Sequence, residues 1–118
     1  MARMSNEDYN SVVSYDKDAR MTISKDFDEA LHEQHVGESI SLRDMVKRYN
    51  ELNDLVQRLM PCVYFPTSFD AETYSQDVRR YNDTVIERVH LQQAIRNRVD
   101  RIGHFLRLWE SPREAKRS

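Results

Sequence analysis

Glycine and proline are scarce in this sequence. The chain of 118 residues contains 2 Gly and 3 Pro, whereas the two together make up about 12% of an average protein. β-Sandwiches and barrels need a turn about every 8–12 residues and rely on these residues to make it. Nucleotide-binding loops need clustered glycines, and Gly37 and Gly103 lie far apart. The shortage therefore excludes turn-rich β folds and glycine-rich phosphate sites.

Cysteines and long apolar runs are missing as well. The single cysteine, Cys62, excludes an internal disulfide and a cysteine-rich zinc site. No apolar run reaches the length of about 18 residues that a transmembrane helix needs, and the first residues lack the apolar core of a signal peptide. The net charge is −2, which by itself favours neither nucleic acid nor acidic lipid as a partner. We expect a soluble, intracellular protein that does not bind membranes.

Large apolar side chains are few for a chain of this size. Leu, Ile, Val and Phe total 27 residues, while charged residues make up 32% of the chain. Long amphipathic helices suit this composition, because each helix buries only a stripe of apolar residues. We predict one all-α domain over residues 24–112. An arm precedes it at 1–23, and a charged tail follows it at 113–118.

The predicted arm is polar and has no helical period. Two short apolar pairs, Val12-Val13 and Met21 with Ile23, are compatible with a small β-hairpin. An isolated hairpin is only marginally stable in water. We therefore favour a flexible arm or one that docks on a partner.

Two helices are predicted in the first half of the domain. A short helix over about 25–36 has Ser24 as its N-cap and Gly37 as its stop. A second helix over about 42–60 begins at Ser41 and ends at Pro61. Its apolar residues recur at alternating steps of three and four, which is the spacing of a coiled-coil seam. They are Leu42, Met45, Tyr49, Leu52, Val56 and Leu59.

After an apolar linker over 61–69, a third helix is predicted over about 70–110. Thr84 and Glu87 offer a possible cap for a restart near Asn82, so a break there is the alternative to one continuous helix. The helix carries two apolar stripes, one in each half. The first comprises Tyr74, Val78, Tyr81, Val85 and Val89, and the second comprises Ile95, Val99, Ile102, Leu106 and Trp109.

The lengths of the helices predict an association surface. At 1.5 Å per residue the second helix is about 28 Å long and the third about 60 Å. In an antiparallel hairpin with coiled-coil-like packing, the second helix covers only the first stripe. The short helix, a second copy of the chain or another protein must then cover the second stripe. We predict that oligomerisation or a standing partner covers Ile95, Val99, Ile102, Gly103, Leu106 and Trp109, with Gly103 allowing close approach.

The basic end of the third helix gives an alternative function. Arginine outnumbers lysine 14 to 4 in the chain, and arginine binds phosphates in bidentate fashion. Nucleic-acid binding is therefore considered for Arg96, Arg98, Arg101 and Arg107. These residues do not share one stripe on a helical wheel. A solvated or salt-bridged surface is the preferred interpretation.

Two Glu-x-x-His pairs, Glu29 with His32 and Glu87 with His90, resemble half of a di-iron carboxylate site in a helical bundle. Residues three apart project on the same side of a helix, as ligands must. Both pairs, however, lie opposite the apolar stripes of their helices. A metal-dependent oxidoreductase is thus the weakest of the hypotheses, and no metal or cofactor is expected.

The sequence as a whole predicts a non-enzymatic helical interaction module. A small self-associating assembly component, adaptor or chaperone of a larger complex fits this description, and a viral or phage structural protein is one instance. The expected partners are a second copy of the chain, another protein or both, with nucleic acid as the alternative. The motifs assign the chain to no known family.

Overall fold

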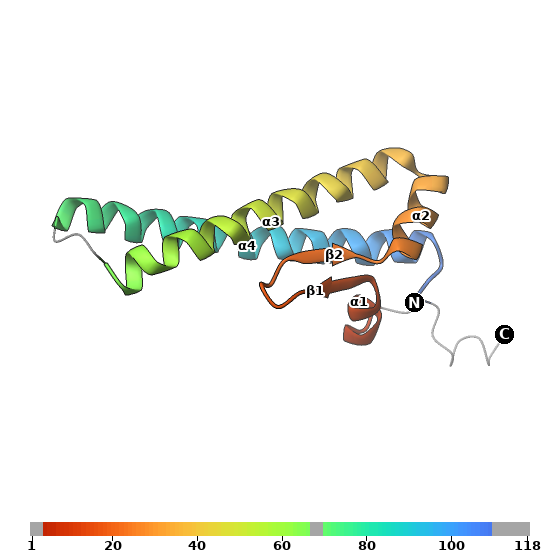
Figure 1. Ribbon diagram of the computed structural model, residues 1–118. Coiled ribbons are helices and arrows are strands. Elements are labelled where there is room, and N and C mark those ends of the chain that lie inside the picture. Colours follow the sequence, from red (N-terminus) through yellow and green to blue (C-terminus); the bar gives the residue numbers. More distant parts are fainter. Residues whose placement is uncertain (1–3, 67–69, 110–118) are drawn as a thin grey trace.

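Two long helices dominate the computed structural model, which describes residues 4–66 and 70–109 (Figure 1). The helices α3 (Val36–Tyr64) and α4 (Ala71–Phe105) lie side by side as an antiparallel hairpin. The molecule is elongated, with extents of 67 × 28 × 21 Å. This arrangement confirms the predicted all-α class and the helical hairpin. Within the described residues, no helix has both the length and the apolarity of a membrane span.

A small layer, which we call the N-terminal block, is formed by residues 4–34. It lies along the C-terminal half of α4 and leaves the other half of that helix beside α3 alone (Figure 1). Its two strands pair antiparallel, with Ser14 opposite Thr22. The elements of the block are α1 (Asn6–Val12), β1 (Val13–Tyr15), β2 (Met21–Ile23) and α2 (Lys25–Gln34).

The structure differs from the expectation of a flexible or partner-docked arm at 1–23. The described part of that segment packs on its own chain, and Tyr9, Val12, Val13 and Met21 are buried. Each element of the block is too short to show a period in the sequence. Asn50 of α3 stabilises the β-hairpin formed by β1 and β2. Its side chain accepts from the Met21 N–H at 2.7 Å and donates to the Met21 carbonyl at 3.0 Å.

The boundary between α2 and α3 lies at His35. Ser24 caps α2 as predicted, because its hydroxyl accepts from the Phe27 N–H. Gly37 does not stop a helix: α3 already begins at Val36, one turn and a half before the predicted start. The glycine costs the helix about 1 kcal/mol relative to alanine. The additional turns bury Ser39, which donates to Asp28 of α2 at 3.2 Å.

Pro61 does not end α3, contrary to the prediction. The helix continues to Tyr64, and the Phe65 N–H donates to the Pro61 carbonyl at 2.8 Å. A proline removes one backbone donor, here the partner of the Gln57 carbonyl. Gln57 is exposed, so water can replace that donor and the helix is not forced to end.

The helix α4 is continuous through Asn82 and ends at Phe105, about one turn before the predicted end. Its C-terminus is a Schellman motif in which the Leu108 N–H donates to the Gly103 carbonyl and the Arg107 N–H to the His104 carbonyl. Arg107 adopts a left-handed φ of 59°. The reversal brings Trp109 back along the helix. The predicted tail at 113–118 lies outside the described residues.

Candidate interaction surface

The predicted association stripe lies inside the molecule. Ile95 and Val99 have no exposed surface, and Ile102 and Trp109 are buried too. They share one core with residues of the N-terminal block, namely Tyr9, Val12, Val13, Met21, Phe27 and Leu31, and Leu106 packs against the same core. The prediction that a partner must cover this stripe is therefore corrected: the chain covers it with its own N-terminal block.

Gly103 admits a side chain of the same chain rather than the backbone of another. A Cβ placed on Gly103 would lie 1.9 Å from the indole of Trp109. The indole N–H donates to the Asp100 carbonyl at 2.9 Å, which fixes the ring against the helix. The close approach predicted for this glycine is real, but it is intramolecular.

Three of the four candidate arginines have partners within the chain. Arg96 donates to Asn6 at 2.7 Å, and its guanidinium lies over the Tyr9 ring. Arg98 and Arg101 both pair with Glu38 of α3, at 2.9 and 3.7 Å. Arg107 is exposed beyond the end of α4. These contacts fit the salt-bridged surface that the sequence favoured over a phosphate-binding stripe.

The Glu-x-x-His residues do not converge on a common point. All four of Glu29, His32, Glu87 and His90 are exposed. Glu29 pairs with Lys25 at 3.7 Å, and Glu87 pairs with Arg48 of α3 at 3.0 Å. In the part of the chain that the structure describes, no group of three His, Cys, Asp or Glu side chains is placed to hold a metal ion.

Part of the exposed apolar surface lies on the other half of α4 and at the tip of the helical hairpin. The side chains of Val89 and Ile86 are 52% and 54% exposed, and at the far end of the hairpin Tyr64 and Tyr74 are exposed as well. The helix α3 packs on one side of this half, and the N-terminal block does not extend over it (Figure 1). The first apolar stripe is therefore only partly covered: Tyr74 and Val89 are exposed, whereas Val78, Tyr81 and Val85 are half-buried.

A second pattern on this half of α4 defines its open side. Six uncharged residues recur at alternating steps of four and three and cover an arc of about 80° at 100° per residue. All seven charged residues between positions 71 and 93 lie outside that arc. We call these six residues the uncharged face: Ala71, Ser75, Val78, Asn82, Val85 and Val89.

Sequence reasoning missed half of the uncharged face because it searched for apolar residues alone. Ala71, Ser75 and Asn82 are exposed and not strongly apolar. The informative signal is the absence of charge at heptad spacing in a chain that is 32% charged. Residues chosen only for solubility would have included charge at several of these positions.

The uncharged face continues directly into a covered surface. Seven residues after Val85, Gln92 donates to the Tyr15 hydroxyl at 2.9 Å. Seven residues after Val89, Arg96 contacts the N-terminal block. Residues seven apart occupy nearly the same side of a helix. One side of α4 is therefore covered by the N-terminal block at its C-terminal half and open at its N-terminal half.

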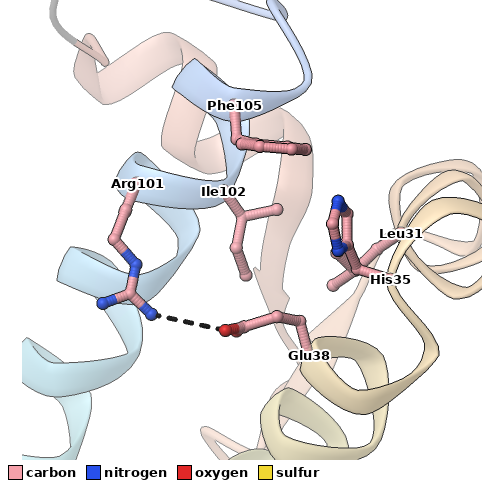
Figure 2. Close-up of a pocket in the computed structure, with 6 residues that line it drawn as sticks. All are labelled: Leu31, His35, Glu38, Arg101, Ile102 and Phe105. Atoms are coloured by element: carbon pink, nitrogen blue, oxygen red, sulfur yellow. Dashed lines mark ion pairs between the residues drawn. The ribbon is translucent and has the colours of Figure 1, made fainter.

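A small cavity of about 220 Å³ lies at the other end of the molecule, between α2, α3 and α4 (Figure 2). His35 packs edge-to-face on Phe105, with ring centroids 4.6 Å apart. Arg101 and Glu38 form an ion pair at its rim (Figure 2). Because these charges are paired with each other, the cavity offers an apolar floor formed by Leu31 and Ile102 rather than a reactive group.

Comparison with known proteins adds no relative. No protein-family model, curated protein or solved structure matches the chain. The chemistry of the surface is therefore the basis for the function proposed below.

Proposed function

We propose that the protein is a non-enzymatic helical interaction module that self-associates as a component of a larger assembly. The observation that carries this proposal is the uncharged face of α4, which lies on the half of this 35-residue helix that the N-terminal block does not cover and includes the exposed Val89. Exposed apolar surface of this kind, bounded by charged residues, is typical of protein contact sites. The role as adaptor, chaperone or structural component belongs to the same proposal.

Self-association is proposed on the N-terminal half of α4 instead of the C-terminal half. The predicted stripe from Ile95 to Trp109 is occupied within the chain. The same argument that pointed to it, an apolar helix surface without a partner, now applies to residues 71–89. Nucleic-acid binding has less support, because Arg96, Arg98 and Arg101 already have acceptors or ring contacts in the chain.

A charge placed on the uncharged face tests self-association. We expect the wild-type chain to form dimers at a concentration of about 50 μM. Val89→Glu is expected to make the protein monomeric at that concentration, because a carboxylate in an apolar contact is costly to desolvate. Val89 is half-exposed, so its replacement leaves the core intact. Sedimentation equilibrium measures both states.

Ala94→Glu is the matched control, since Ala94 is exposed on α4 and lies outside the uncharged face. It should associate like the wild type. A wild-type chain that stays monomeric at 200 μM (about fourfold higher), or a Val89→Glu variant that associates as tightly as Ala94→Glu, would contradict the proposal.

A further inference from the structure

We infer that two copies of the chain pack their uncharged faces together in antiparallel orientation, about a two-fold axis that passes near Asn82. This inference rests on the proposed self-association and specifies its partner and geometry. It is carried by the shape of the molecule, by the position of the open surface and by the chemistry at its centre.

The molecule has a step in thickness along α4. Over Gln92 and Arg96 the N-terminal block forms a third layer, as the hydrogen bonds to Tyr15 and Asn6 show. Along the N-terminal half of α4 the helical hairpin is only two helices thick (Figure 1). The thin half extends from the start of α4 at Ala71 to about Arg88, where Asn53 joins α4 to the β-hairpin of the N-terminal block.

The step decides the orientation of the pair. In a parallel pair the two N-terminal blocks would stand opposite each other and hold the uncharged faces apart. In an antiparallel pair the thin half of each copy lies beside the N-terminal block of the other copy, so that the two steps in thickness fit together. The thin halves then overlap along their whole length, and shape complementarity is best in this arrangement. The two-fold axis must cross α4 at the middle of the thin half, close to Asn82.

The residues near that axis suit contact with their own copies. In a two-fold pair a residue on the axis meets its own equivalent, so a charged residue there would face a like charge. Asn82 is neutral and its amide both donates and accepts, so two copies can hydrogen-bond to each other. A single asparagine in an otherwise apolar seam also fixes the register of helices. Val78 and Val85 flank it on either side.

The contact area reaches the lower limit for a specific dimer. The thin half is about 26 Å long and about 20 Å wide across its two helices. Complete overlap would bury about 1,000 Å² in total, the area that a biological interface with good complementarity must reach. The tyrosines at the tip of one hairpin, Tyr64 and Tyr74, would reach the partner's N-terminal block. They are exposed in the single chain.

Asn82→Asp tests the axis with almost no change in shape. We expect it to raise the dimer dissociation constant at least tenfold at pH 7, because two carboxylates would meet at the axis. Asn97→Asp is the control: Asn97 is also an exposed residue of α4 but lies outside the uncharged face. It should leave the constant unchanged. Sedimentation equilibrium gives the constants, and far-UV circular dichroism verifies that both variants are folded.

Spin labels test the orientation independently. Single cysteines at Glu72, Asp83 and Gln93, in a Cys62→Ser background because Cys62 is exposed, each carry one label at an exposed position. In the antiparallel pair the Asp83 labels are closest. The other two pairs separate along the axis by about 30 Å, since each is about ten residues from it. Pulsed dipolar spectroscopy measures the three distances in the dimer.

The outcomes separate this inference from the proposed function. A minimum at Asp83 together with weakened association of Asn82→Asp supports the antiparallel pair. Three similar distances, or Asn82→Asp associating like the wild type, would overturn it while the dimer itself still upholds the proposed function. A wild-type chain that remains monomeric overturns both.

Discussion

The indole of Trp109 packs directly on Gly103. The indole occupies the space where any other residue at position 103 would carry its Cβ. The Schellman turn at Arg107 and the hydrogen bond from the indole to Asp100 hold the ring there. Gly37 is the opposite case, because no atom lies within 4 Å of its missing Cβ. The two glycines therefore differ in what a methyl group would do.

Gly103→Ala is expected to lower the free energy of unfolding by about 1–3 kcal/mol, the usual cost of overpacking. Gly37→Ala is expected to raise it by up to about 1 kcal/mol through helix propensity alone. Urea unfolding followed by circular dichroism measures both. A red shift in the emission of Trp109 should accompany the first change only. Equal stabilities of the two variants would show that the indole does not pack as described.

The packing of α2 on α3 depends on one carboxylate. Asp28 accepts from the Arg43 guanidinium at 2.6–3.2 Å and from the Ser39 hydroxyl at 3.2 Å. The hydrogen bonds from Arg43 hold the pKa of Asp28 below its usual value. A carboxyl group whose pKa is depressed in the folded state stabilises the fold above its unfolded pKa. That contribution is lost as the pH falls through the folded value.

We expect Asp28→Asn to destabilise the protein at pH 7 by about 1 kcal/mol and to lose less stability than the wild type between about pH 5 and pH 3. The neighbouring Asp26→Asn, at an exposed position of the same helix, serves as the control with a wild-type pH dependence. Urea midpoints at several pH values provide the comparison. If Asp28→Asn and the wild type lost stability in parallel, the link between α2 and α3 would not depend on this charge.

Asparagines on α3 tether the β-hairpin in a way that sequence patterns did not reveal. Asn53 is fully buried, donates to the Asp18 carbonyl at 2.7 Å and accepts from Arg88 at 2.7 Å. It connects the hairpin, α3 and α4 at one point. An asparagine inside a helix resembles a surface residue in the sequence, and only the tertiary contacts distinguish it from one.

At the scale of the whole molecule, the step in thickness controls how copies can join. The extent of one chain is 67 Å. Two copies that overlap only by their thin halves, about 26 Å each, form a particle longer than either copy alone. A fully parallel pair would keep the length of one chain and change only its width.

Small-angle X-ray scattering is therefore expected to give a maximum dimension of about 110 Å for the dimer. Measured on dilute protein or on Val89→Glu, it should fall to the length of the single chain. A dimer whose maximum dimension equals that of the monomer would exclude the antiparallel pair that overlaps by its thin halves, without excluding self-association.

The sequence by itself determined the fold class, the hairpin of two long helices and the cap at Ser24. These features depend on composition, on the spacing of apolar residues and on local hydrogen bonds, all of which involve residues close together in the sequence. Tertiary structure alone decided which stripe of α4 is covered. The N-terminal block supplies that cover through many short elements, each contributing one or two buried residues from distant positions. A pattern without a local period cannot be recognised in a sequence, although it determines which surface is left for a partner.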